Sequence, residues 1–451
     1  MKMYFVILSI FVLLGCGKKH VSSIAGFYIQ SEDLSGLISL HSSKKACATN
    51  NRIFSLCLEN AKQGDRIIIP AGEFHFSTEL YQLRIPSNVI LKGMGRGKTL
   101  LVFHPTTMGI QKMGGVGLYT QDGSHIDIED FTIHNVGSDN IVTKTMANTV
   151  SLLVEDSKYV QIRNVEFVGG HFGVLLWNTT MSYEVNRNIT IEDCNFSRQA
   201  SSGLLMKKCS RSNVKDNTFN NTGSDGLKTS KLCKWLTIEN NISEHNRRDG
   251  FDFYDGCLEC SIIKNKAIGN YLHGFDLKGN PDANGNFVFR DNIITDNIAS
   301  GNGYSGFSLQ NVRKVILIGN LATKNMQYGY YFNNVQSCTF SSLQSSENMR
   351  HGYLLNKISR SSFTGCTAID NGQSKSLEKY NGFHLNSNAG ENIFEACVAI
   401  NGTNLRNMGS QEYGFFFENE SVNNKVRNSE FRNNRSGNSI GGDRKSQLIK
   451  M

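Results

Sequence analysis

A short phrase with glycine at its centre recurs along most of the chain and constrains the fold more than any other feature. An apolar residue follows each glycine, and the glycines are Gly173, Gly203, Gly226, Gly250, Gly274, Gly306, Gly329, Gly352, Gly382 and Gly414. Most steps between neighbours are 23 or 24 residues, and steps of 30 or 32 are explained by the same unit plus a loop. Such a period is typical of a solenoid, in which each repeat packs on its neighbours.

The segments between the glycines alternate apolar and polar residues in short runs, as in 236–241 and 315–320. This alternation is typical of strands. A period near 23 residues accommodates three short strands and three turns, which is one coil of a parallel β-helix. Equivalent positions of successive coils would then lie about 4.8 Å apart. The sequence therefore predicts an all-β, single-stranded solenoid.

Asparagine is expected in two stacked turn columns. One column contains Asn217, Asn241, Asn265, Asn292 and Asn320, and the other, five residues later, contains Asn246, Asn270, Asn297, Asn325, Asn348 and Asn371. Stacked amides can hydrogen-bond to one another and to the backbone. The 43 Gly and only 4 Pro among 451 residues agree with many similar turns and exclude collagen and proline-rich linkers.

Cysteines also follow the repeat, because Cys209, Cys233 and Cys257 recur at 24-residue intervals. Cys257 and Cys260 are close enough in sequence to pair. A reduced packing ladder is preferred, since stacked side chains point in parallel directions that suit disulfide geometry poorly. Two Cys-x-x-Cys motifs at zinc-ribbon spacing are absent from the sequence.

A solenoid needs protected ends. Residues 51–63 are predicted to form a capping helix that buries Ile53, Leu56, Leu58 and Ala61, and Gly64 ends it. The stretch Gly-Asp-Arg-Ile-Ile-Ile-Pro-Ala-Gly at 64–72 then opens the first coil. The cap and this stretch resemble the start of the pectate-lyase-like superfamily. That resemblance implies a right-handed parallel β-helix with an N-terminal capping helix, a fold that hosts many activities.

The first residues carry an export pattern. Lys2 precedes an apolar stretch at 4–14, which is too short to span a membrane as a helix, and Leu-Leu-Gly-Cys follows at 13–16. The last motif resembles the bacterial lipobox, which implies cleavage before Cys16 and lipid anchoring of the mature protein to the cell envelope. An uncleaved signal anchor, or an ordinary signal with a chance cysteine, is the alternative. The expected division is a signal peptide at 1–15, a lipidated N-terminus and linker at 16–45, the β-helix with its cap at 46–430 and a basic tail at 431–451.

The net charge of +8 permits acidic partners without naming one. The sequence has no arginine-rich run and no nucleic-acid motif, so no nucleic-acid partner is expected. The oligomeric state does not follow from the sequence.

Three consecutive coils depart from the regular columns. The residue before the repeat glycine is Asp225, Asp249 and His273, and the second residue after it is Lys228, Asp252 and Asp276. Carboxylates stacked at about 4.8 Å repel one another unless a cation intervenes. Calcium, with about six to eight oxygen ligands at about 2.3–2.6 Å, would suit Asp225, Asp249 and Asp252. The alternative is a solvated charge ladder in which Lys228 neutralises Asp252.

The phrases Asp225-Gly, Arg-Asp-Gly-Phe-Asp at 248–252 and Gly-Phe at 274–275 resemble the calcium-dependent pectate lyases of polysaccharide lyase family 9. The resemblance implies calcium at Asp225, Asp249 and Asp252, and a lysine on the next coil that abstracts the proton from C5 of a uronate. The chain departs from the family at two positions. Arg248 stands where a further aspartate is usual, and Asp276 stands at the position of the catalytic lysine.

Uronate β-elimination needs a neutralised carboxylate and a positioned base. Arg247 or Arg248 could assist the metal, and Tyr254 and Asp276 are expected substrate contacts. The candidate bases are Lys278, His273 and Lys228, of which Lys278 has the best claim because Lys228 lies beside Asp252. The predicted function is a polysaccharide lyase or a C5-epimerase acting on an acidic, uronate-containing glycan. The alternative is a non-catalytic surface β-helix for glycan binding or adhesion.

Overall fold

The computed structural model describes residues 24–30, 35–41, 47–77, 83–104, 115–136, 149–180, 182, 186–281, 284–374, 378–386, 388–402, 411–418, 421–441 and 447–449. They belong to two compact units, Met1–Leu205 and Met206–Met451. Strands dominate both units, and within the described ranges α1 (Cys47–Asn60) is the one α-helix. No helix of this part of the chain has the length and apolar character needed to cross a bilayer. The predicted signal peptide and Cys16 lie outside the described residues.

Unit 1 begins with an antiparallel hairpin of β1 (Ile24–Gln30) and β2 (Ser35–His41), within the stretch expected as a linker. β1 also pairs antiparallel with β3 (Arg66–Ile68), so the hairpin covers the edge of the first coil. The following strands pair in parallel with the strands one coil later. They are β4 (Gly72–Ser77), β5 (Ile90–Lys92), β6 (Thr99–His104), β7 (Val116–Gln121), β8 (Ser124–Asn135), β9 (Val150–Glu155), β10 (Lys158–Gly169), β11 (Phe172–Trp177), β12 (Thr190–Glu192) and β13 (Asn195–Ser197).

The capping helix is confirmed, but it buries a different face from the predicted one. Phe54, Cys57 and Leu58 are fully buried, at i, i+3 and i+4, whereas Leu56 is 47% exposed. The Phe54 ring packs on Phe76 of β4 with centroids 5.7 Å apart. Helix α1 also begins four residues before the predicted start, at Cys47. The prediction missed Phe54 as the anchor because it counted the face from Ile53.

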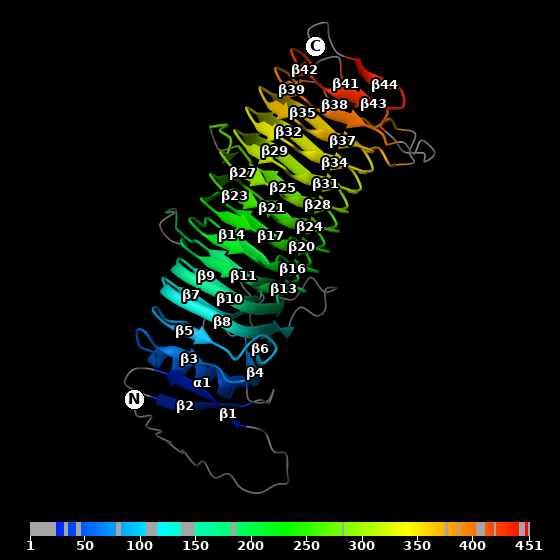
Figure 1. The fold of residues 1–451 in the computed structure, drawn as a ribbon. Coiled ribbons are helices and arrows are strands. Elements are labelled where there is room, and N and C mark those ends of the chain that lie inside the picture. Colours follow the sequence, from blue (N-terminus) through cyan, green and yellow to red (C-terminus); the bar gives the residue numbers. More distant parts are fainter. Residues whose placement is uncertain are drawn as a thin grey trace, which may run out of the picture. The chain divides into compact units, whose positions relative to one another are not determined.

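In unit 2 each coil contributes strands to stacked parallel sheets (Figure 1). The strands at the repeat glycines, together with β44, form what we call the glycine sheet. In unit 2 it comprises β17 (Leu227–Ser230), β21 (Phe251–Phe253), β25 (Phe275–Lys278), β29 (Phe307–Arg313), β32 (Tyr330–Gln336), β35 (Tyr353–Ser359), β38 (Phe383–Leu385), β41 (Tyr413–Phe417) and β44 (Gly437–Gly441). β14 (Leu204–Lys207) spans the boundary between the units in the sequence.

Two further stacks and three short strands complete the coils of unit 2. One stack contains β15 (Asn213–Lys215), β19 (Thr237–Glu239), β23 (Ser261–Ile263), β27 (Ile293–Thr295), β30 (Ile316–Ile318), β33 (Thr339–Ser341), β36 (Ser362–Thr364), β39 (Ile393–Glu395), β42 (Lys425–Arg427) and β45 (Gln447–Ile449). The other contains β16 (Thr218–Asn220), β20 (Ile242–Glu244), β24 (Lys266–Ile268), β28 (Ile298–Ser300), β31 (Leu321–Thr323), β34 (Gln344–Ser346), β37 (Thr367–Ile369), β40 (Val398–Ile400) and β43 (Glu430–Arg432). The short strands are β18 (Cys233–Lys234), β22 (Cys257–Leu258) and β26 (Phe289–Arg290).

Stacked aromatic rings form the interior side of the glycine sheet. Consecutive centroids lie 4.4–5.1 Å apart along the series Phe251, Phe275, Phe307, Tyr330, Tyr353, Phe383 and Phe415. The repeat glycine before each ring is required by close approach, because a Cβ on Gly250 would lie 2.7 Å from the Gly274 carbonyl oxygen. The inward rings leave the alternate residues of each strand on the outer face. This alternation positions the candidate site.

The two asparagine ladders are present, with a shift in register at one coil. The first runs through Asn217, Asn241, Asn265, Asn297 and Asn320, and each amide Oδ1 accepts from the backbone N–H of the preceding rung. Asn292, predicted for this ladder, instead accepts from the Cys260 N–H. The second ladder likewise contains Asn302 in place of Asn297. The extra residues after Gly279 precede Asn292, so in this coil each ladder contains the asparagine one turn later than the predicted one.

The cysteine ladder is only partly as predicted. Cys209 and Cys233 are free and buried, but Cys257 forms a disulfide with Cys260. Their Cα atoms are 6.2 Å apart within one coil, inside the range that a disulfide spans. The prediction of a reduced ladder is therefore wrong for Cys257, because its partner comes from its own turn and not from the next coil.

Candidate functional site

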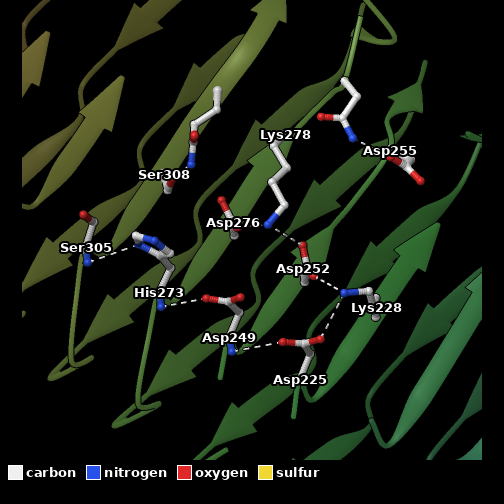
Figure 2. Close-up of polar contacts among 12 residues, drawn as sticks. Asp225, Lys228, Asp249, Asp252, Asp255, His273, Asp276, Lys278, Ser305 and Ser308 are labelled. Atoms are coloured by element: carbon white, nitrogen blue, oxygen red, sulfur yellow. Dashed lines mark hydrogen bonds and ion pairs between the residues drawn. The ribbon is translucent and has the colours of Figure 1, made fainter. Parts of the chain in front are cut away.

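The irregular residues come together on the outer face of the glycine sheet in unit 2. Lys228 of β17, Asp252 of β21 and Asp276 of β25 are register partners on neighbouring strands. Their strands turn Phe251, Phe275 and Leu277 inward, so the charged residues between them point out (Figure 2). Asp225 and Asp249 lie at the turn before the repeat glycine of their coils.

The carboxylates are buried although they stand on the outer face. Asp225 and Asp252 are 0% exposed, Asp249 is 1% exposed and Asp276 is 3% exposed. One oxygen from each of Asp225, Asp249 and Asp252 lies within 4.8 Å of the others. Calcium with ligands at about 2.3–2.6 Å requires oxygens at such separations. These three residues therefore fit a divalent cation.

Backbone groups fix two of these carboxylates. The Asp249 N–H donates to Asp225 Oδ1 at 3.2 Å, and the His273 N–H donates to Asp249 Oδ1 at 2.8 Å. The Ser224 hydroxyl donates to Asp225 Oδ2 at 3.2 Å. Each coil thus holds the carboxylate of the coil before it, so the positions of the ligand atoms are set by the main chain.

Two lysines lie among the carboxylates. Lys228 Nζ is 2.5 Å from Asp252 Oδ2 and 3.4 Å from Asp225 Oδ2. Lys278 Nζ donates to Asp276 and lies 3.4 Å from Asp252 Oδ1. Both ammonium groups also lie over the ring of Tyr254, at 5.0 and 5.3 Å from its centroid. Asp252 is therefore enclosed by both lysines, as Figure 2 shows.

The cluster carries an excess of negative charge. Four carboxylates and two ammonium groups leave two negative charges unbalanced when all are ionised. Burial, reinforced by the charges of Asp276 and Asp225, raises the pKa of Asp249 well above its usual value. Burial and the Asp225 charge likewise raise the pKa of Asp252. Oδ1 of Asp276, buried here, accepts no hydrogen bond from the described residues. A divalent cation would supply the missing charge.

The lysines are strongly held as ammonium ions. Burial opposes the charge of Lys278, but the Asp276 and Asp252 carboxylates outweigh it and raise the pKa of Lys278. The same balance, with Asp252 and Asp225 as partners, raises the pKa of Lys228. An amine accepts a proton only when it is neutral. Neither lysine can therefore act as a base while its carboxylate partners are ionised and have no other cation to pair with.

His273 is engaged at the nitrogen that would accept a proton. Its Nδ1 accepts from the Ser305 N–H at 3.3 Å, which leaves the other nitrogen as the N–H donor of the neutral ring. Burial lowers the pKa of His273, so the ring stays neutral near pH 7. The sequence interpretation missed Ser305, although its place before the next repeat glycine puts its N–H one coil above His273.

The remaining predicted contacts lie at the rim. Arg247 and Arg248 are exposed, and Tyr254 is 38% exposed beside the two lysines. Asp276 lies in the cluster itself, paired with Lys278. All the predicted site residues except Cys16 thus fall in three neighbouring coils. Asp255, which the chain places nearby, pairs with Lys231 at 3.4 Å and stands apart from the cluster.

Comparison with known proteins identifies the fold. Residues 114–288 and 282–431 match the family described as "Right handed beta helix region". The A-module of the mannuronan C-5 epimerase AlgE4 from Azotobacter vinelandii is 15% identical, with a TM-score of 0.52 over 89% of this chain and 96% of that chain. No match was found among curated protein sequences.

Two other solved structures are similar at the same low level of identity. A double mutant of the periplasmic alginate epimerase AlgG is 14% identical, with a TM-score of 0.53 over 74% of this chain and 85% of that chain. The pre-mature gene product 12 of bacteriophage phi29 is 11% identical, with a TM-score of 0.63 over 84% of this chain and 54% of that chain. At these identities the likeness is one of fold.

Proposed function

The chain belongs to the right handed beta helix family, and from that premise we propose that it is a lyase or C5-epimerase acting on an acidic, uronate-containing glycan. The observation that carries the proposal is the buried group of Asp225, Asp249 and Asp252, whose oxygens fit one divalent cation. The similarity to epimerases named for mannuronan and alginate agrees with an acidic polysaccharide as substrate.

Asp225, Asp249 and Asp252 would hold calcium on the outer face of the glycine sheet. Bound there, calcium would neutralise the uronate carboxylate and make the C5 proton more acidic. Arg247 and Arg248, exposed at the rim, would bind the same carboxylate or its neighbour. The half-exposed ring of Tyr254 would pack on a sugar.

Lys278 is the proposed base. Its Nζ is held between Asp252 and Asp276 and reaches the outer face over Tyr254. Because these carboxylates keep the amine protonated, Nζ could abstract a proton only when the charges of both Asp276 and Asp252 were paired with another cation. Lys228 stays beside Asp225 and Asp252 and would balance their charge. His273 would donate a hydrogen bond from its free N–H.

Ultraviolet absorbance of unsaturated uronate ends tests the proposal. The protein is incubated with pectate, alginate and unsulfated glycosaminoglycans, with calcium or with a chelator, and C5 inversion is followed in parallel by proton NMR. A lyase gives absorbance, an epimerase gives inversion, and the chelator should abolish either signal. Neither signal on any polymer, together with no calcium-dependent change in melting temperature, would exclude the enzyme.

A non-catalytic glycan-binding protein is the second candidate. The ion pairs of Lys228 and Lys278 and the occupied Nδ1 of His273 favour it, since none of the three is free to accept a proton. Binding of an acidic glycan without absorbance or inversion would identify this function.

The proposed setting is the bacterial cell envelope, to which a lipid on Cys16 would attach the protein. The lipobox-like sequence at 13–16 supports this proposal. A glycan site carried on an anchored protein would act on polymers near the cell surface.

A further inference from the structure

Positive charges gather at one corner in the first coils of unit 2, where the glycine sheet ends and the next short strand begins. Two consecutive coils supply five cationic side chains there, together with an exposed tryptophan. The Lys208 N–H donates to Ser230 O, and the Arg211 N–H donates to Lys234 O, each at 3.1 Å, so the two coils stack at this corner. We call it the basic corner, and it consists of Lys207, Lys208, Arg211, Lys231, Lys234 and Trp235.

The cations of the basic corner are close enough to influence one another. Burial lowers the pKa of Lys207, and the charges of Lys208 and Lys231 lower it further. A bound anion relieves this kind of repulsion, because it favours the charged form of each neighbouring amine. A ligand with several negative charges would therefore be stabilised by several cations at once.

Trp235 presents its ring among these cations. The indole is 38% exposed, the Arg211 guanidinium carbon lies 4.7 Å from the ring centroid, and Lys234 Nζ lies 5.9 Å from it. The backbone of Trp235 has a φ of +53°, which is rare for a bulky residue, and the indole N–H donates to Glu259 Oε2 at 3.1 Å. These contacts hold the ring at the corner. An exposed aromatic ring there can pack on the apolar face of a sugar.

The basic corner continues the candidate site toward the earlier coils. Tyr254, whose ring lies under both lysines of the cluster, donates its backbone N–H to Thr229 O at 3.2 Å. Together with the contact of Lys208 to Ser230, this places Lys207, Ser230 and Tyr254 in one row of the glycine sheet. Neighbouring strands lie about 4.8 Å apart. Lys207 is two strands from Tyr254, so a glycan chain bound at the cluster would reach it within a few sugars.

The charge at this corner changes sign in the following coil. The position of Lys231 is taken there by Asp255, and the position of Trp235 is taken by Glu259. An anionic chain is therefore attracted toward the earlier coils. A broad anionic surface such as a bilayer would meet both signs of charge at once, which favours a single glycan chain as the partner.

We infer that the basic corner binds further acidic sugars of the glycan whose reacting uronate lies at the Asp225–Asp249–Asp252 cluster. The inference rests on the proposed function and narrows its substrate class to glycans with negative charge on consecutive sugars. The glycan chain then extends from the cluster across Lys231 to Lys207. The lysines and Arg211 pair with its carboxylates, and Trp235 packs on a sugar ring.

Binding of uronate fragments of equal length tests the inference. Polygalacturonate and alginate fragments carry a carboxylate on every sugar, whereas hyaluronan fragments carry one on every second sugar. Isothermal titration calorimetry in calcium should give tighter binding of a fully acidic fragment, and its affinity should fall with added salt. The chain has two tryptophans, so a Trp177→Phe protein reports on Trp235 alone. Its emission should change when the fully acidic fragment binds.

Variants at the basic corner are compared with a matched pair elsewhere. Lys207→Ala combined with Lys231→Ala should weaken binding of the fully acidic fragment about three- to tenfold at low salt, and less at high salt. Trp235→Ala should weaken it about three- to tenfold at both salt concentrations, because ring packing is not screened. Lys264→Ala combined with Lys314→Ala removes the same charge from exposed positions on other coils and should leave binding unchanged.

The outcomes separate this inference from the proposed function. Calcium-dependent binding or turnover of a uronate polymer that the corner variants do not affect, or tighter binding of hyaluronan fragments, would overturn the inference and leave the proposed function in place. If vesicles of anionic phosphatidylglycerol changed the Trp235 emission and glycan fragments did not, the corner would belong to a membrane contact and the inference would be wrong. No calcium-dependent binding or turnover of any uronate polymer would overturn both proposals.

Discussion

Asp252 is the residue on which the contacts of the site converge, because it lies between Lys228 and Lys278 and shares the metal-sized space with Asp225 and Asp249. Asp252→Asn keeps the shape and removes one charge. In the unaltered protein, calcium at about 100 times its Kd should stabilise the fold by about 2.7 kcal/mol, and the variant should lose most of that gain. Differential scanning fluorimetry with and without calcium measures it.

Asp255→Asn is the control for this experiment. Asp255 lies three residues away but pairs with Lys231 outside the cluster. Its replacement should leave the calcium response intact. An equal loss in both variants would mean that calcium acts through general surface charge.

A buried histidine gives the fold a pH dependence. Burial, helped by the neighbouring His384 and Arg350, lowers the pKa of His351 well below its usual 6.5, and its Nδ1 accepts from the Asn381 N–H. Below pH 6.5 His351 therefore binds a proton in the unfolded chain but stays unprotonated in the folded protein. The free energy of unfolding should be independent of His351 above this pH and should fall by about 1.4 kcal/mol for each pH unit below it. Urea unfolding between pH 5 and pH 8 should show a shallower fall for His351→Gln.

At the scale of elements, the asparagine ladders should carry a large share of coil stability. Asn325 donates from its amide to Ala299 O and Asn348 Oδ1, and its Oδ1 accepts from the Asn302 backbone and amide. Asn325→Ala leaves several of these buried groups unpaired and should cost about 2–4 kcal/mol. Urea denaturation checks this value. The exposed Gln344→Ala should change stability by less than about 0.5 kcal/mol.

The repeat made most of the fold predictable from the sequence, since a glycine that faces a carbonyl of the next coil tolerates no other residue. What the repeat cannot supply is the position of an insertion within a coil. From the sequence, the extra residues after Gly279 could be assigned to the turn before Asn292 or to the turn after it. That assignment decides whether Asn292 or Asn297 belongs to the first ladder. The prediction for Cys257 was wrong for a similar reason, because its equal spacing with Cys209 and Cys233 favoured a reduced ladder over the pairing with Cys260 in its own turn.

The candidate site was predictable as a location because charged residues interrupt otherwise neutral columns. The charge interactions within the site were harder to predict from the sequence, since they depend on distances between coils. The sequence placed Lys278 beside Asp276, but its second contact with Asp252 emerges only when the coils are stacked. The contact of Ser305 with His273 likewise crosses from one coil to the next.

At the scale of the whole molecule, the proposed lipid anchor at the lipobox-like sequence can be tested directly. The described residues include no helix that could cross a membrane. The attachment proposed above is through a lipid on Cys16. In a bacterial host grown with labelled palmitate, the unaltered protein should incorporate the label and sediment with membranes. Cys16→Ala should lose both properties, because a lipid chain contributes about 0.8 kcal/mol of membrane affinity for each buried methylene.

Cys57→Ala controls for the loss of a cysteine elsewhere, since that thiol is buried in α1. It should keep the label and the membrane association. A Cys16→Ala protein that still sediments with membranes without label would point to an uncleaved signal anchor. In that case the β-helix would reach the same surface by an apolar segment, and the glycan site would keep its access to polymers outside the cell.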